Sequence, residues 1–142
     1  MFKLLIATDG SEHAYRAIDA AARLGKLVPG AEVVLLNVRE LPVYYGELPA
    51  YDFAAIEEAA RLNQVNLLDE ALAKARACGL QQVVTEAAVG VPAAEIARVA
   101  NERAVDQIVI GTHGRNALAG LVMGSVAQRV VHLVDMPVLL VK

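Results

Sequence analysis

The fold is decided by the stretch Asp106-Gln107-Ile108-Val109-Ile110-Gly111-Thr112-His113-Gly114, which is followed after nine residues by Gly124-Ser125-Val126. The segment Val105–Ile110 is short and mostly apolar, as is typical of a strand buried in a parallel sheet. Gly111 and Gly114 then predict a turn in which the backbone can approach a ligand closely, because neither residue carries a Cβ atom. The stretch therefore predicts a buried strand that ends in a glycine turn.

A helix is predicted to begin just after this turn, with Ser125 at its N-cap. Apolar residues follow at helical spacing: Val126, Val130, Leu133 and Val134. A strand end, a glycine turn and a helix start direct free N–H groups and the positive end of a helix dipole into one crevice. The pattern favours a phosphate-binding loop, although glycines that only turn the chain and a serine that only caps a helix would produce it too. It is neither a P-loop, since no Gly-Lys-Ser/Thr follows the strand, nor the dinucleotide motif G-x-G-x-x-G.

Strands and helices are predicted to alternate along the whole chain. Strands are expected at Lys3–Thr8, Glu32–Val38, Gln82–Val89, Val105–Ile110 and Val138–Val141. Helices are expected at Ser11–Val28, from about Asp52 to Cys78, from Pro92 and from Ser125. The first helix has one apolar face (Ala14, Ala17, Ile18, Ala21, Leu24), the second a buried stripe (Leu62, Val65, Leu68, Leu72, Ala75), and the third contains Ala93, Ile96, Ala97 and Ala100. The connection Arg39–Tyr51, which holds two prolines and a glycine, is expected to lie on the surface.

This alternation predicts an α/β fold with one open five-stranded parallel sheet and helices on both faces. Right-handed crossovers favour the strand order 3-2-1-4-5, which puts the topological switch point between the first and fourth strands. Ligands bind at the carboxyl ends of strands beside such a point. Asp9 follows the first strand and Gly111 ends the fourth, so both are expected in one nucleotide-binding crevice.

Composition indicates a single domain over residues 1–142. A hydrophobic fraction of 56% with 20% charged residues argues against disorder, and the net charge of −3 gives no general attraction for nucleic acid or anionic membranes. The single cysteine, Cys78, excludes an internal disulfide and is expected to be an inert, partly buried thiol. Neither a transmembrane run nor a separate cleavable signal before Lys3 is evident, so we expect a cytoplasmic protein.

The spaced glycine motif Gly111-x2-Gly114-x9-Gly124-Ser125 resembles the ATP-binding signature of the universal stress protein family. The opening Leu4-Leu5-Ile6-Ala7-Thr8-Asp9-Gly10-Ser11 is similar to that family's first strand and turn. The closing Met136-Pro137-Val138-Leu139-Leu140-Val141 is similar to its last strand. The resemblance covers essentially the whole chain. It implies a Rossmann-like fold of the adenine nucleotide alpha hydrolase-like type, and ATP as the ligand, with Mg²⁺ or Mn²⁺ as a helper.

The resemblance also implies roles for individual residues. The adenine and ribose would lie against Ala7-Thr8-Asp9 and Val38. The phosphates would lie over Gly111, Gly114, Gly124, Ser125 and Val126. Ile110, at the end of the fourth strand, is a further candidate nucleotide-binding residue.

Each of these roles has a structural alternative. Asp9 can accept hydrogen bonds from ribose or hold a phosphate-bound metal ion through oxygen, but it can also simply fix its own turn. Val38 offers an apolar wall and backbone groups to the base, and is equally natural as core filler. Ser125 can donate to a phosphate, cap its helix, or do both. Gly90 allows the third strand to approach the ribose or only turns the chain. Arg115 follows the second glycine and could reach a phosphate, or its side chain could simply be solvated.

Catalysis is not predicted. Phosphotransfer needs a positioned base, a metal clamp and a cation, and no clear general base or lysine accompanies Asp9 and Arg115. His113 lies in the loop. His13 and His132 lie far from it in sequence, on two separate predicted helices, and the three histidines do not have the spacing of metal ligands. We expect an ATP-binding stress-response or signalling module without strong catalysis. A slow ATPase and a nucleotide-free structural member of the family stay open.

Two other classes of protein share the sheet topology. A response-regulator receiver needs a phosphate-accepting aspartate at the end of the third strand, and Gln82–Val89 ends without one. A small flavin carrier is compatible with the topology, but the chain has no tryptophan and few aromatic residues to stack on a flavin ring.

The final strand predicts a homodimer. Val138–Val141 is apolar on both faces and lies at a sheet edge in the order 3-2-1-4-5. No charge interrupts it and Pro137 stands only at its start, so the usual protections of an edge strand are absent. Pairing with a symmetry mate would satisfy its backbone and bury its side chains, and the resemblance implies the same interface. The alternative is that Arg39–Tyr51 of the same chain covers this edge.

Overall fold

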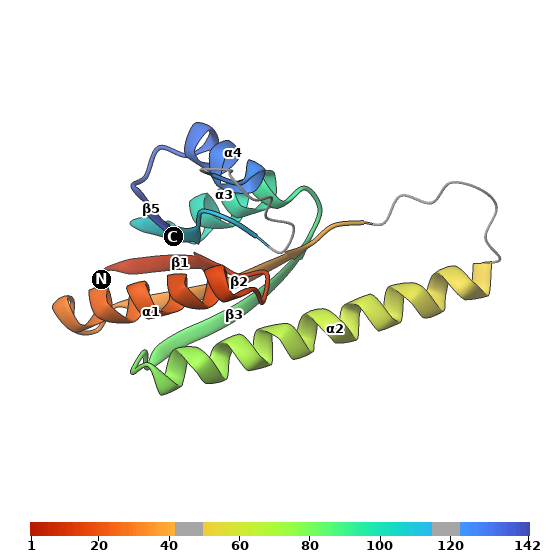
Figure 1. Cartoon of the computed structure of the whole chain (residues 1–142), viewed down its shortest axis with the longest axis horizontal. Coiled ribbons are helices and arrows are strands. Elements are labelled where there is room, and N and C mark those ends of the chain that lie inside the picture. The colour runs from red at the N-terminus through yellow and green to blue at the C-terminus, as the bar shows by residue number, and fades with distance from the viewer. Residues whose placement is uncertain (42–49, 115–122) are drawn as a thin grey trace.

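The computed structural model describes residues 1–41, 50–114 and 123–142 (Figure 1). Its strands are β1 (Lys3–Ala7), β2 (Glu32–Arg39), β3 (Gln82–Val89), β4 (Gln107–Gly111) and β5 (Val138–Val141). Its helices are α1 (Glu12–Leu27), α2 (Ala50–Ala77), α3 (Pro92–Glu102) and α4 (Ser125–Leu133). The predicted alternation is confirmed. The connection predicted over Arg39–Tyr51 is wrong at its ends, which belong to β2 and α2, and its centre lies outside the described residues.

The five strands form one parallel sheet in the order β3-β2-β1-β4-β5, as the sequence predicts. β1 lies between β2 and β4, with Leu5 level with both Val34 and Ile108. The chain leaves β1 toward β2 on one side and enters β4 on the other. The switch point therefore lies between the carboxyl ends of β1 and β4.

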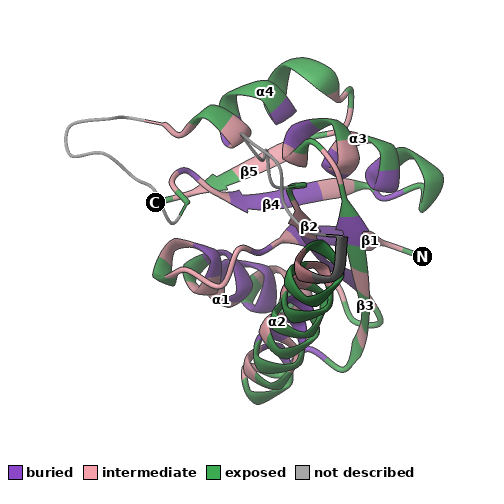
Figure 2. Cartoon of the chain, turned by 90° about the vertical axis from the view of Figure 1, so that its right-hand side faces the viewer, coloured by how far each residue is buried: buried purple, intermediate pink, exposed green. Residues whose placement is uncertain are grey.

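Helices cover both faces of the sheet (Figure 2). α1 and α2 pack on one face over a core that includes Ile6, Ile18 and Leu35. α3 and α4 pack on the other face over a core that includes Leu36 and Ile108. The central strands β1 and β4 are buried from both sides, which explains why their sequences are continuous apolar runs and do not alternate.

The ends of α1 follow from its sequence. Ser11 is the N-cap, and its hydroxyl oxygen accepts the backbone N–H of Ala14 at 3.2 Å. The predicted apolar face is buried as far as Ala21, and Leu24 is partly buried against the same core. The cap fixes the first turn of α1 directly beside the carboxyl end of β1.

The buried stripe predicted for α2 is partly wrong. Leu62 and Val65 are 47% and 40% exposed, whereas Gln64 is buried together with Leu68 and other residues of the same face. Residues 62 and 64 lie on nearly opposite sides of a helix with 3.6 residues per turn, so burying Gln64 turns Leu62 outward. Gln64 faces the strands because its amide is hydrogen-bonded there.

The first half of α2 runs past the end of the sheet (Figure 1). Its apolar side chains are consequently open to solvent, with Phe53 and Ile56 more than two-fifths exposed. Within the described part of the chain, none of the helices combines the length and the apolar character that crossing a membrane requires.

Candidate functional site

A cleft of about 1030 Å³ opens at the carboxyl ends of β1, β2 and β4. Its walls also include the first turns of α1, α3 and α4 and one side of α2. Ten of the predicted site residues line it: Ala7, Thr8, Asp9, Val38, Ile110, Gly111, Gly114, Gly124, Ser125 and Val126. Gly90 is not among the lining residues, and Arg115 lies outside the described residues. Segments far apart in the sequence thus meet at the switch point.

The loop after β4 rests directly on the turn after β1. A Cβ atom added at Gly114 would lie 2.7 Å from Oδ2 of Asp9, and one added at Gly124 would lie 3.1 Å from the carbonyl oxygen of Thr112. The first distance is shorter than real Cβ contacts, so a larger residue at 114 would have to displace the Asp9 carboxylate or the loop itself. Gly114 and Gly124 are therefore points where this loop closely approaches other parts of the chain, and Gly114 joins the β4 loop to Asp9.

Asp9 both shapes its turn and faces the cleft. Its Oδ1 accepts the backbone N–H of Ser11 at 2.9 Å, while Oδ2 is the atom next to Gly114. Gly10 has a positive φ of 79°, and its N–H contacts Oγ1 of Thr8 at 3.3 Å. The turn-fixing role considered for Asp9 is present, and the second carboxylate oxygen lies between the two loops that form the cleft.

Ser125 is not the N-cap of α4, so that prediction is wrong by one residue. Gly124 is the cap, in an extended conformation with φ −72° and ψ 163°, and Ser125 is already the first helical residue. The N–H of Gly124 donates to the carbonyl of Thr112, which holds Gly124 in the extended conformation. Gly124 has no side chain with which to cap α4, and the first turn of this helix lines the cleft. The N–H groups of a first helical turn have no partner within the helix.

Val38 presents its backbone to the cleft as well as its side chain. The carbonyl of Leu36 accepts the N–H of Thr8 at 2.8 Å, so Leu36 faces β1. Residues two apart in a strand face the same neighbour, and Val38 therefore also faces β1, beyond the last residue of that strand, Ala7. The N–H and C=O of Val38 are directed at the gap where β1 has ended.

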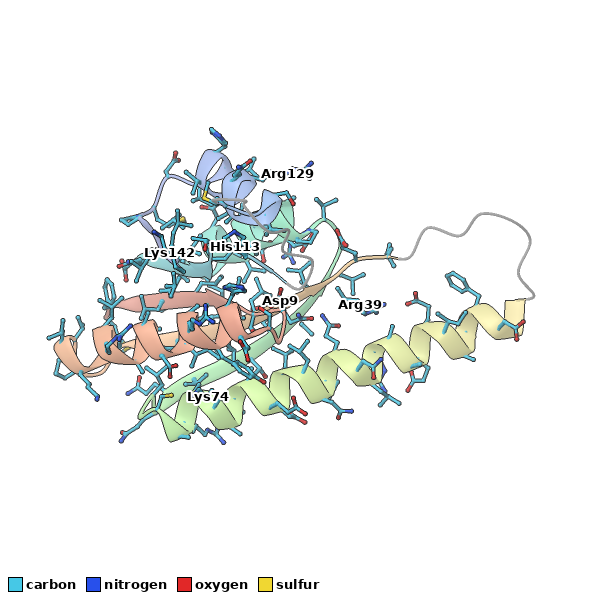
Figure 3. All side chains as sticks on the ribbon, in the orientation of Figure 1. Asp9, Arg39, Lys74, His113, Arg129 and Lys142 are labelled. Atoms are coloured by element: carbon cyan, nitrogen blue, oxygen red, sulfur yellow. The ribbon has the colours of Figure 1, made fainter. Side chains whose placement is uncertain are left out.

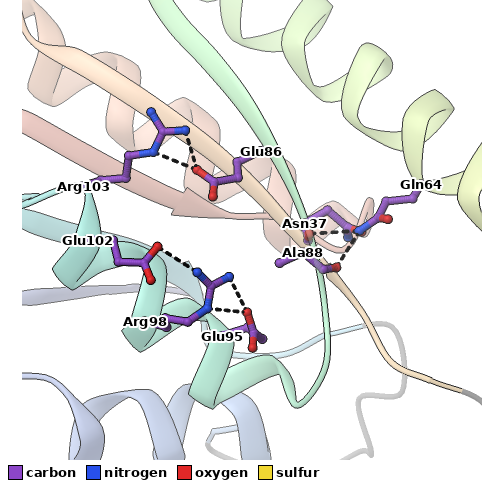
Figure 4. A network of polar contacts seen from close by, with 8 residues as sticks. All are labelled: Asn37, Gln64, Glu86, Ala88, Glu95, Arg98, Glu102 and Arg103. Atoms are coloured by element: carbon purple, nitrogen blue, oxygen red, sulfur yellow. Dashed lines mark hydrogen bonds and ion pairs between the residues drawn. The ribbon is translucent and has the colours of Figure 1, made fainter.

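A buried amide network in the wall of the cleft was not predicted from the sequence (Figure 4). Nδ2 of Asn37 donates to the carbonyl of Thr8 at 2.7 Å. Nε2 of Gln64 lies 3.1 Å from the carbonyl oxygen of Asn37 and 2.9 Å from that of Ala88. All of these side chains lie in the interior, where an unpaired amide is costly. The sequence feature that could have indicated this network is Asn37, which interrupts the otherwise apolar run 33–38.

The α2 side of the cleft is polar and carries one ion pair. Arg39 extends from the end of β2 toward α2 (Figure 3), and its guanidinium lies 3.2 Å from the carboxylate of Glu57. Among the described lining residues, Arg39 is the only lysine or arginine. Electrostatic attraction for an anion in this part of the cleft must therefore come mainly from backbone N–H groups and the α4 dipole.

Two histidines meet beside the β4 loop, which the sequence did not reveal. The ring centroids of His13 and His113 are 5.3 Å apart, and Nδ1 of His113 is 3.1 Å from Oγ1 of Thr112. His13 lies near the start of α1, whereas His132 is on α4. Within the described ranges, no three acidic, histidine or cysteine side chains gather closely enough to hold a metal ion by themselves.

Comparison with known proteins gives concordant matches over the whole chain. A model of the universal stress protein family matches residues 1–142. Universal stress protein YxiE of Bacillus subtilis is 35% identical over 147 residues, which cover 99% of this chain and 98% of the relative.

Solved structures match as well. A universal stress protein crystallised in complex with cAMP is 26% identical, with a TM-score of 0.69 over 99% of this chain and 96% of that one. The universal stress protein from Archaeoglobus fulgidus, solved in complex with dAMP, is also 26% identical, with a TM-score of 0.67 over 100% and 98% of the two chains.

Proposed function

The chain belongs to the universal stress protein family, and on that basis we propose that it binds an adenine nucleotide, specifically ATP, in the cleft between β1 and β4. The observation that carries this proposal is the packing of Gly114 on Asp9. This packing joins the β1 turn to the β4 loop, and the start of α4 lines the same cleft. Two family members at 26% identity were solved with adenine nucleotides, which supports the ligand class.

The parts of the cleft suit the parts of ATP. The first turn of α4 and the glycine loop offer backbone N–H groups and a helix dipole to the phosphates. Asp9 is the polar group between the loops and would accept hydrogen bonds from the ribose hydroxyls. Val38 offers an N–H donor and a C=O acceptor to the adenine edge. Gly90 and Arg115 have no described contact with this cleft and are left out of the proposal.

A divalent cation fits this cleft only together with the nucleotide. Mg²⁺ usually keeps several waters and takes one or two carboxylates plus phosphate oxygens. The carboxylate of Asp9 lines the cleft beside Gly114. Asp9 would therefore be the protein ligand for Mg²⁺ or Mn²⁺, and the ion would supply neutralisation of phosphate charge.

We further propose that the protein senses ATP without turning it over rapidly, and that another protein responds to its ATP state. Rapid phosphotransfer requires a positioned base and a charge-stabilising cation. The described cationic side chain of the cleft, Arg39, is paired with Glu57 on the far wall. In single-turnover assays ATP should outlast binding equilibrium by far. Fast turnover that is lost in Asp9→Asn would contradict this and make the chain an enzyme.

The working form is proposed to be a cytoplasmic homodimer joined through β5. β5 is an edge strand, and Leu140 on it is 37% exposed. Beside it, an apolar depression of about 380 Å³ is lined by Leu24 and Leu27 of α1 and by residues 139–142. Pairing with a second copy would cover both features. A net charge of −3 gives no reason to expect nucleic acid or membrane partners.

Calorimetry with ATP, ADP, AMP and FMN tests the ligand class. We expect the three adenine nucleotides to bind and FMN not to bind. Binding of FMN alone would indicate a flavin carrier. Absence of binding to all four at millimolar concentration would identify a nucleotide-free structural member of the family and overturn the proposal.

A further inference from the structure

The backbone hydrogen-bond ladder between β1 and β2 ends at Thr8, one step before a regular parallel ladder would reach Val38. The carbonyl of Leu36 accepts the N–H of Thr8 at 2.8 Å, which is a regular step of a parallel ladder. The next step would run from the N–H of Val38 to the carbonyl of Thr8. That carbonyl is instead bonded to Nδ2 of Asn37 at 2.7 Å.

The identity of the Asn37 atom is fixed by chemistry. A carbonyl oxygen can only accept, so the side-chain atom that faces Thr8 must be the amide nitrogen. Asn37 is 7% exposed and Thr8 is 4% exposed, so water does not compete effectively for this bond. The side-chain amide of Asn37 is therefore bonded to the carbonyl of Thr8, which the N–H of Val38 would use if the ladder continued.

We propose that Asn37 is a positioning residue that keeps the N–H of Val38 available for the adenine ring by occupying the carbonyl of Thr8. This inference rests on the proposed function. Adenine carries the N1 acceptor beside the N6–H donor, and these match the N–H and C=O of Val38. Guanine carries O6 in place of N6–H₂ and does not match in the same orientation. Asn37, which also lines the cleft, thereby contributes to the choice of base through the backbone of Val38.

Gln64 has a different structural role in the same hydrogen-bond network: it connects α2 to the sheet. Its Nε2 lies within hydrogen-bond distance of the carbonyls of Asn37 and Ala88, and so fastens α2 to β2 and β3. It holds the backbone of Asn37 in place but does not contact the carbonyl of Thr8. The two amides can therefore be tested separately.

Amide hydrogen exchange measured by NMR gives the direct readout. In the unliganded wild type, the Val38 amide should exchange faster than that of Leu36, and AMP should protect it. In Asn37→Leu, the freed carbonyl of Thr8 should capture the Val38 N–H, so this amide becomes protected without ligand. Asn101→Leu makes the same change at an exposed position on α3 and should leave Val38 unchanged.

The affinity readout uses AMP and 1-deaza-AMP, which lacks the N1 acceptor. Wild type should prefer AMP by about tenfold, the size of one hydrogen bond to a buried group. Asn37→Leu should bind AMP about tenfold more weakly and lose this preference. Asn101→Leu should keep it.

The possible failures are distinguishable. If wild type binds no adenine nucleotide, the proposed function fails. If wild type prefers AMP over 1-deaza-AMP and Asn37→Leu does so equally, the proposed function stands and the role of Asn37 is wrong. Should Asn37→Leu not fold, a Val38 amide in the unliganded wild type that is as protected as that of Leu36 would overturn the inference without any variant.

Discussion

Gly114 and Asp9 lie far apart in the sequence, yet their close approach joins the two sides of the cleft. The glycine spacing is visible in the sequence because a loop that passes close to another segment favours glycine, which has no Cβ atom. Asn37 and Gln64 could not be assigned this way. Their partners lie on other elements, and an amide in an apolar segment does not reveal which carbonyl it meets.

Replacing Gly114 by valine should weaken ATP binding by tenfold or more while the domain stays folded. The new side chain would collide with Oδ2 of Asp9 and push the loop away from the β1 turn. Calorimetry measures the affinity, and circular dichroism measures the fold. Ala54→Val, on the exposed side of α2, is the matched control and should bind normally. Unchanged ATP affinity in Gly114→Val would show that the loop is only a turn.

Cys78 provides a residue-scale test on the opposite side of the molecule from the cleft. Burial, and secondly the hydrogen bond from its Sγ to Asp19 at 3.1 Å, raise the pKa of this thiol above its ordinary value. Less of it is thiolate at neutral pH, so alkylation by iodoacetamide should be slow. Asp19→Asn should lower the pKa and speed alkylation, whereas Lys74→Gln should slow it, because Lys74 lowers this pKa. Equal rates in all three proteins would contradict the account.

At the scale of elements, α2 shows where helical periodicity is insufficient. Its apolar residues lie on several sides, so apolar spacing alone selects the wrong stripe, with Leu62 and Val65 inside. The helix orientation is decided by Gln64, because a buried amide must reach the carbonyls of Asn37 and Ala88. α1 was predicted well because its apolar residues lie on one face and Ser11 caps it.

Gln64→Leu should therefore destabilise the domain by about 1–2 kcal/mol, although it adds apolar surface. The substitution removes the donor that both carbonyls share and leaves the orientation of α2 less determined. Asn63→Leu, at the exposed neighbouring position, should change stability by less than about 0.5 kcal/mol. Urea unfolding followed by circular dichroism measures both. A Gln64→Leu protein as stable as the wild type would show that packing alone orients α2.

At the scale of the whole molecule, the strand order was predictable because few topologies satisfy right-handed crossovers with helices on both faces. The sequence also indicated that β5 is an edge. It did not indicate which backbone groups of β5 point outward. The carbonyls of Pro137 and Val141 accept N–H groups from the β4 side, so Leu140 directs its N–H to the open edge.

Leu140→Pro should therefore convert the proposed dimer to a monomer without breaking the β4–β5 ladder. Proline removes the outward N–H and is tolerated at edge positions of this kind. Leu140→Ala keeps the N–H and should remain dimeric. Light scattering measures the mass of each. A monomeric wild type, or a dimeric Leu140→Pro, would rule out assembly through β5.

An NMR titration of the unliganded protein with ATP tests whether the cleft between β1 and β4 is an ATP site. We expect saturable shifts of the backbone amides of Val38, Gly114, Gly124 and Ser125, with the edge strand β3 unaffected. Shifts centred elsewhere on the molecule, or none at millimolar ATP, would contradict it.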